Sequence, residues 1–155
     1  MNLNDVYTAL KTVIEATARH PSASHHDTFC VAEDVNPQSP VRTVGLEEVT
    51  PGQPAEAWTA GTGMGADPIV VDWQMEVLYG AQDQTIWRYE IPLLIKSIMD
   101  LPHSSVNQTT YSGQIRTVSM TAESIIGAAE ADVESDSFRV FLWRITTVFD
   151  SRDPS

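Results

Sequence analysis

The sequence predicts an α+β fold, in which an antiparallel or mixed β-sheet packs against an N-terminal helix and a central helix. Two segments carry apolar residues at helical spacing, one at the start of the chain and one in the middle. Several strand-like segments follow one another directly, which favours an antiparallel or mixed sheet over alternating βαβ units. The chain has 155 residues, and we expect a single domain over residues 1–155.

The first helix is predicted from Asn2 to Ala18. One apolar stripe repeats at i, i+3 and i+4, and it consists of Leu3, Val6, Tyr7, Leu10, Val13 and Ile14. Asn2 or Asn4 can cap its start, and Asp5 lies near the positive end of the helix dipole. Pro21 disfavours helix in the residue before it, so the helix ends there.

Short strands are predicted next, over residues 28–35 and 40–49, with a possible third over 55–60. Cys30 is the single cysteine, so an intrachain disulfide is impossible. We interpret it as a small buried hydrophobic residue. The Gly-x-Gly-x-Gly spacing in "AGTGMGADP" is followed by a strand and not by a helix, which argues against a phosphate-binding loop. We expect a flexible loop near residues 61–68.

The most regular strand pattern is "VVDWQMEVLYG", residues 70–80. Apolar residues alternate with polar ones, and the apolar set is Val71, Trp73, Met75, Val77 and Tyr79. Asp72 and Glu76 then share the opposite face. Two carboxylates on one face could perform acid–base chemistry. A solvated strand face is the simpler use of such a pair.

The central helix is predicted between Thr85 and Leu101. Its buried stripe comprises Trp87, Ile91, Leu94, Ile95, Ile98 and Leu101. Pro92 falls inside this pattern, where proline costs about 3 kcal/mol. Either the helix kinks there or its regular part begins near Glu90. Pro102 ends the helix, and "HSSVNQTTYSG" is a polar connection.

Two strands close the chain, over residues 114–123 and 138–149. Both faces of the last strand carry apolar residues: Phe138, Val140, Leu142 and Val148 on one, and Phe141, Trp143, Ile145 and Phe149 on the other. One face should meet the helices. The other should be covered by part of this chain or by another subunit, because large apolar faces are uncommon on soluble monomers.

The charge balance is strongly acidic, with 21 acidic against nine basic residues and a net charge of −12. Tight DNA binding relies on Lys and Arg, so this chain is poorly equipped for it. The charge serves solubility, or it forms the wall of a passage through which DNA slides without sticking. No apolar run approaches the roughly 20 residues that span a bilayer. The N-terminal segment has no basic region before an apolar core, so we do not expect it to act as a secretion signal. We therefore expect a protein made in a cytoplasm, with no membrane partner.

Candidate chemical groups form no convincing set. His20, His25 and His26 lie near Asp27, but adjacent residues on extended chain point apart, so we interpret them as exposed loop histidines and not as metal ligands. His103 precedes two serines, Ser104 and Ser105, with no motif that orients the imidazole or forms an oxyanion hole. We expect no enzymatic activity, no cofactor and no metal.

Tryptophan buries a large area and keeps one polar group, which suits subunit contacts. Trp58 and Trp87 lie near connecting segments, and Trp143 lies on the last strand. We predict these three as oligomer-interface residues, although Trp143 also suits the core.

Three segments together give the chain a familiar layout: the helix "DVYTALKTVIEA", the strand "IVVDWQMEVLYG" leading into "IWRYEIPLLIKSIMDLP", and the ending "FRVFLWRITTVFDSRDPS". In their order, size and texture they resemble the tail terminator, tail-completion and head–tail joining proteins of tailed bacteriophages. The likeness covers most of the chain but includes no diagnostic motif, so no functional residue is carried over.

That resemblance implies a homo-oligomeric ring, commonly a hexamer, in the tail or neck of a virion assembled in the host cytoplasm. The ring caps the tail tube, stops its polymerisation and joins it to the head connector, without covalent chemistry. Its partners are the tail tube protein and the head-completion protein, and DNA passes without tight binding. Asp72 and Glu76 would then face water, the lumen or a neighbour.

Two alternatives remain. One is another neck, baseplate or tail subunit, built from similar sheet-and-helix units. The other is a small α+β ligand-binding or enzymatic domain with a pocket between sheet and helix. Such a domain would be a compact monomer or dimer holding a few buried ionisable groups.

Overall fold

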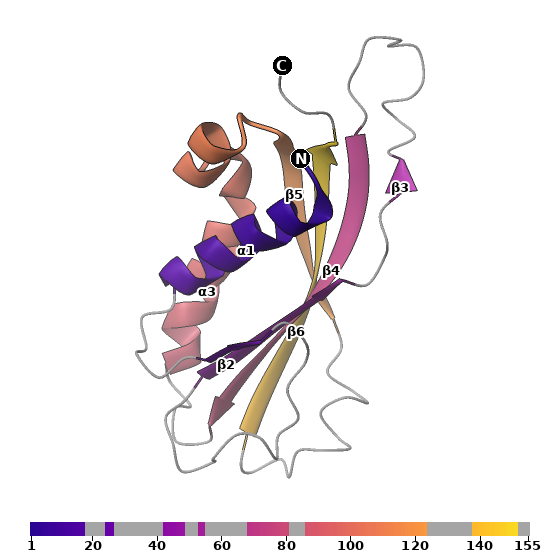
Figure 1. The fold of residues 1–155 in the computed structure, drawn as a ribbon. Helices are drawn as coiled ribbons and strands as arrows, with labels where there is room; N and C mark the ends of the chain where they lie inside the picture. The colour runs from indigo at the N-terminus through magenta and orange to yellow at the C-terminus, as the bar shows by residue number, and fades with distance from the viewer. Residues whose placement is uncertain are drawn as a thin grey trace.

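The structure is a computed structural model, and it describes residues 1–17, 24–26, 42–48, 53–54, 68–80, 86–123 and 138–151. Two helices lie on one face of a six-stranded sheet, which confirms the predicted α+β class (Figure 1). The helices and strands are α1 (Leu3–Thr17), β1 (Ser24–His26), β2 (Arg42–Glu48), β3 (Gln53–Pro54), β4 (Pro68–Gly80), α3 (Ile86–Met99), β5 (Ile115–Glu123) and β6 (Phe138–Asp150).

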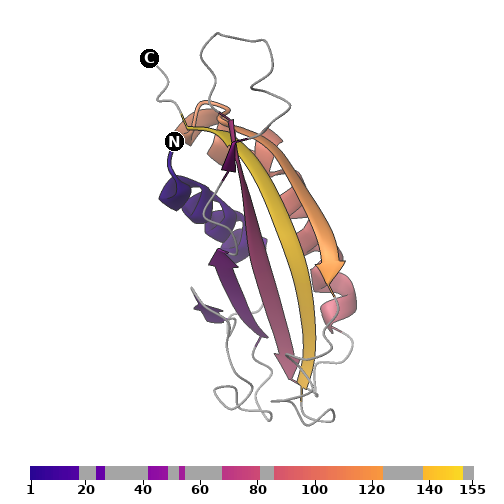
Figure 2. The same cartoon turned by 90° about the vertical axis from the view of Figure 1, so that its right-hand side faces the viewer.

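The strand order in the sheet is β1-β2-β4-β6-β5, with β3 paired to the start of β4. The β1–β2 pair is parallel and every other pair is antiparallel, so the sheet is mixed. Strand β4 pairs with β6 over its whole length, from Pro68 opposite Asp150 to Gly80 opposite Phe138. Figure 2 shows these two long strands side by side, with β5 beyond β6. The predicted strands over 40–49, 70–80, 114–123 and 138–149 are confirmed.

The core lies between the sheet and the two helices. Alternate residues of β4 and β6 point into it, and the almost fully buried ones include Val71, Trp73, Met75, Ile145 and Phe149. The helices contribute Val6, Leu10, Ile14, Leu94 and Ile98. Burying one such side chain stabilises the fold by about 1.5–3 kcal/mol, so this face of the sheet supplies most of the packing energy.

Helix α1 begins with a reciprocal cap. The Asn2 side-chain oxygen accepts a hydrogen bond from the Asp5 backbone N–H at 2.9 Å, and the Asp5 carboxylate accepts one from the Asn2 N–H at 2.9 Å. Both bonds satisfy donors that the first helical turn leaves without partners. Asn2, not Asn4, is therefore the capping residue.

Helix α3 begins at Ile86 and contains Pro92, so the alternative that its regular part begins near Glu90 is wrong. Pro92 lies on the exposed side, where water can compensate for the hydrogen bond that proline cannot donate. The predicted buried stripe is confirmed for Ile91, Leu94, Ile98 and Leu101, and Ile95 is half-buried.

The predicted polar connection after α3 is built from helical turns around a buried asparagine. A 3-10 turn covers Leu101–His103, and a π-helical turn covers Val106–Thr110. The Asn107 amide nitrogen donates to the Pro102 and Ile115 carbonyls at 2.8 and 3.0 Å, and its oxygen accepts from the Ile115 N–H at 3.0 Å. These bonds fix the direction in which the chain enters β5.

The early strands differ from the prediction. His25 and His26 lie in β1, paired with β2, so their assignment to a loop is wrong. A two-residue strand, β3, pairs Gln53 with Val70 and Pro54 with Ile69 of β4. The predicted strands over 28–35 and 55–60, Cys30, His20, Asp27 and residues 61–67 of the predicted loop lie outside the described residues.

Candidate functional site

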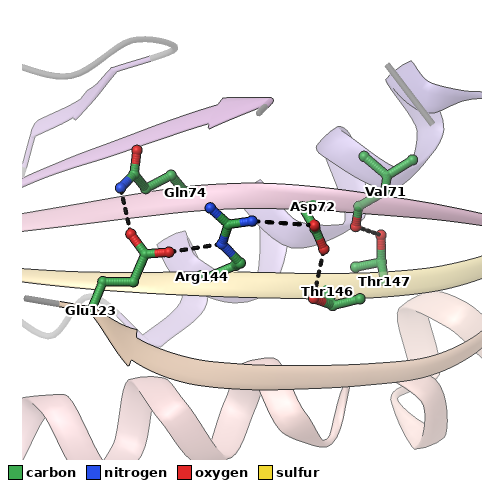
Figure 3. Close-up of polar contacts among 7 residues, drawn as sticks. All are labelled: Val71, Asp72, Gln74, Glu123, Arg144, Thr146 and Thr147. Carbon is green, nitrogen blue, oxygen red and sulfur yellow. Dashed lines mark hydrogen bonds and ion pairs between the residues drawn. The ribbon is translucent and has the colours of Figure 1, made fainter. Parts of the chain in front are cut away.

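The face of the sheet that carries no helix bears a polar strip across three strands (Figure 3). We call it the outer polar strip, and its members are Asp72 and Gln74 of β4, Glu123 of β5, and Arg144 and Thr146 of β6. These residues alternate in sequence with buried ones such as Trp73 and Ile145, so strand geometry places them on the opposite face.

Arg144 is the centre of the strip. Its Nε donates to Glu123 Oε1 at 2.7 Å, and its Nη1 donates to Asp72 Oδ2 at 3.4 Å. Gln74 Nε2 donates to Glu123 Oε2 at 2.6 Å, and Thr146 Oγ1 donates to Asp72 Oδ1 at 2.6 Å. One guanidinium therefore serves two carboxylates, and the strip carries one net negative charge.

The electrostatics of the strip follow from this arrangement. The hydrogen bond that Arg144 donates to Glu123, the negative charge of Glu123 and the weaker contacts with Asp72 raise the pKa of Arg144, while desolvation opposes them. The Arg144 side chain is 43% exposed, against 20% for Asp72 and 23% for Glu123. The strip is thus partly exposed to water.

The sequence prediction paired Asp72 with Glu76. The continuous β4–β6 ladder does put both on the outer face, with Glu76 opposite Leu142. Glu76 is only 6% exposed, however, whereas Asp72 belongs to the outer polar strip. Of the two acids only Asp72 contributes appreciable surface, and its assignment to a channel wall stays a prediction.

The expectation that both faces of the last strand are apolar is wrong for its middle. Arg144 and Thr146 face outward there and join the outer polar strip. Leu142 on the same face is 5% exposed and Val148 is half-buried. On the helix-covered face, the described side chains of β6 are apolar apart from Thr147.

One buried polar contact lies on the inner face. Trp73 Nε1 donates to Thr147 Oγ1 at 3.0 Å, and the Thr147 hydroxyl donates to the Val71 carbonyl at 3.3 Å. Thr147 is fully buried, so it satisfies an indole N–H that would otherwise have no water to bond. This is a structural contact within the core.

The three tryptophans predicted at an interface fall in different settings. Trp143 is 7% exposed and stacks on Phe141 with ring centroids 5.9 Å apart, so it belongs to the core and offers little surface to a partner. Trp58 lies outside the described residues. The structure describes only the backbone of Trp87, in the first turn of α3.

A second candidate surface lies on the exposed side of α3. We call it the α3 outer stripe, and it consists of Tyr89, Pro92, Lys96 and Met99, at i, i+3, i+7 and i+10. Tyr89 is 76% exposed and Met99 is 41% exposed, and they are the exposed large hydrophobic side chains among the described residues. Sequence reasoning missed this stripe because it considered only the buried side of the helix.

The serine next to His103 has a structural role. Ser104 Oγ donates to the Leu101 carbonyl at 2.7 Å and accepts from the Asn107 N–H at 3.2 Å. In the described part of the chain, no group of three or more His, Cys, Asp or Glu side chains is placed to hold a metal ion. None of the described helices combines the length and hydrophobicity needed to cross a bilayer.

Comparisons with known proteins give a likeness in structure but none in sequence. No protein-family model matches the chain. No curated protein matches it. Among solved structures, the chain is similar to the sheath/tube terminator of an extracellular contractile injection system, PVC, determined by cryo-EM in the extended state. The identity is 10% and the TM-score 0.47, and the match covers 99% of this chain and 58% of that chain.

Proposed function

We propose that this chain is a structural subunit of a phage tail or related tubular particle, and that its copies form a ring, expected to be a hexamer. The ring ends the tube, stops its polymerisation and offers a surface to the head connector. The observation that supports this best is the element order: α1, the long strand β4, α3, and then β5 and the long β6. That order is the one implied by the family that the sequence resembles.

The architecture suits a subunit that bears load and performs no chemistry. The unbroken β4–β6 ladder fixes a rigid sheet, and the helices close one of its faces. Among the described residues, the α3 outer stripe and the outer polar strip are two separate candidate surfaces for contacts. A ring subunit needs two different patches, because each copy meets one neighbour on each side.

The acidic balance suits a ring around DNA. With a net charge of −12, the chain has few cations to neutralise phosphates, so a DNA molecule would pass without being held. Asp72 is one candidate for the wall of such a passage.

The experiment uses the purified protein with the tube protein of its parent particle. We expect light scattering to give a molar mass several times the 17.1 kDa of one chain, alone or once tubes are added. We also expect shorter tubes, with extra density at one end in electron micrographs. Tube protein alone is the control.

Two outcomes would overturn the proposal. A chain that stays monomeric with and without tubes, and leaves tube length unchanged, is not a terminator. Gold labelling of the parent particle at the baseplate, and not at the head-proximal tail end, would assign the chain to a baseplate subunit instead.

A further inference from the structure

We propose that strand β5 is a docking edge for a second copy of this chain. Two copies pair their β5 strands antiparallel across a two-fold axis at Met120, so that the two sheets join into one. The contact is isologous, because both copies use the same surface. It goes beyond the proposed function and does not depend on it, since it follows from the chemistry of a single strand.

Strand β5 lies at an edge of the sheet. Among the described strands it pairs with β6 and with no other, and Figure 2 shows it beyond β6. Four of its side chains are exposed, those of Thr117, Ser119, Thr121 and Ala122. An edge strand presents a row of backbone N–H and C=O groups that another chain can pair with. The outer side of β5 is therefore a template for a further strand.

The middle of β5 lacks the features that commonly protect an edge strand, which are charged residues, proline and bulges. An irregularity in the register occurs at Arg116, and Glu123 lies at the other end of the strand. The six residues between them, "TVSMTA" at 117–122, carry no charge and no proline, and three of them are β-branched. This stretch has the usual length of a strand, about five or six residues.

The charges at the two ends of β5 select a second copy as the occupant. An antiparallel copy brings each Arg116 near the Glu123 of the other chain, whereas a parallel copy would bring like charges together. Arg116 uses Nε and Nη2 on Asp150 and stays 46% exposed, so Nη1 can donate to a further carboxylate. Glu123 is 23% exposed while it accepts from Arg144 and Gln74. The strand is thus complementary in charge to its own antiparallel copy.

The side chains of β5 match their own copy on both faces when Met120 lies on the axis. Directly paired residues then share a face. On the outer face, Ser119 lies opposite Thr121 of the other copy, and hydroxyl pairs of this kind stabilise antiparallel sheets. On the helix-covered face, buried Val118 lies opposite Ala122, which is exposed in the single chain. The two half-buried Met120 side chains meet at the axis.

The first test is disulfide trapping in a Cys30→Ser background, which removes the natural thiol. Met120→Cys places two thiols directly opposite each other across the axis, within the reach of a disulfide. We expect a covalent dimer on mild oxidation. Thr117→Cys is the control, because its two copies would lie about 20 Å apart, at about 3.3 Å per residue. Position 117 is the more exposed of the two, so random collision would link the control faster.

The second test measures self-association by sedimentation at several concentrations in about 0.15 M salt, where repulsion between the acidic chains is screened. We expect the wild type to form dimers. Met120→Lys brings two ammonium groups together at the axis and should weaken dimerisation about tenfold or more. Met99→Lys makes the same change on α3 and should dimerise like the wild type. Circular dichroism shows whether each variant is folded.

Two results would overturn this inference. One is a covalent dimer that forms no faster with Met120→Cys than with Thr117→Cys. The other is a wild-type chain that sediments without dimers at every concentration. Neither result decides the proposed ring, which is tested by the addition of tube protein. Rings on tube ends together with failed trapping at position 120 would leave the ring in place and exclude the β5 contact.

Discussion

The two faces of the β4–β6 pair differ in character: the inner face is apolar and the outer face is charged. On the inner face, Trp73 and Ile145 are 2% and 0% exposed and pack against the helices. On the outer face, Asp72 and Arg144 form an ion pair that water reaches. Because side chains alternate along a strand, one ladder supplies a hydrophobic core on one side and a charged surface on the other. Stability should reside on the inner face and partner recognition on the outer one.

The largest expected effect is a difference in stability between substitutions at two neighbouring positions of β6. Ile145→Ala removes a fully buried side chain and should lower the free energy of unfolding by about 2–5 kcal/mol. Thr146→Ala removes a half-buried hydroxyl on the outer face and should cost about 1 kcal/mol or less. Urea unfolding at one fixed protein concentration measures both. Equal losses would contradict the assignment of the two faces.

The next effect concerns the polar contact inside the core. Thr147→Val keeps the side-chain shape but removes the acceptor for Trp73 Nε1, and should cost about 1–3 kcal/mol. The same substitution at position 146, Thr146→Val, is the matched control and should cost less. Indole N–H chemical shifts would report the lost hydrogen bond. A Thr147→Val protein as stable as the control would show that the buried contact is unimportant.

A smaller effect tests the outer polar strip. Arg144→Gln leaves Asp72 and Glu123 without their shared cation and should lower the free energy of unfolding only slightly, because water screens exposed ion pairs. Adding salt should shrink the difference from the wild type, because mobile ions screen exposed charges. Lys96→Gln is the control for loss of one positive charge. A cost that salt leaves unchanged would indicate a packing role for Arg144.

The smallest expected effect is a shift in the alkaline titration of Tyr111. Burial, and then the negative charge of Asp5, raise the pKa of Tyr111 above its ordinary value of 10.0. Because the pKa of Tyr111 is higher in the folded state, the contribution of Tyr111 to the free energy of unfolding is complete below pH 10. That contribution is lost as the pH rises through the pKa of the folded state. Asp5→Asn should shift the Tyr111 absorbance titration to lower pH. If the titration does not shift, the charge of Asp5 is not a cause of the raised pKa.

Much of the fold could be predicted because its signals are local. The alternation from Val71 to Val77 and the helical spacing from Leu3 to Ile14 each arise within a few residues. The Asn2–Asp5 cap is also local. The buried face of α3 followed from the same periodicity, although Pro92 left the start of that helix open.

The outer polar strip could not be predicted, because it depends on strand register over long distances. The contacts that join β4 to the other two strands of the strip span 49 residues for Gln74 with Glu123, 72 for Asp72 with Arg144 and 74 for Asp72 with Thr146. Only the β4–β6 and β5–β6 registers bring them together. Likewise, Trp143 could have served the core or an interface until the helices were seen to cover its face.

The most direct test of the central claim is electron microscopy of the purified wild-type protein, with tube protein added in a second sample. We predict closed rings with a central opening, either free or seated on one end of each tube. Single 17.1 kDa particles in both samples, with bare tube ends, would contradict the account.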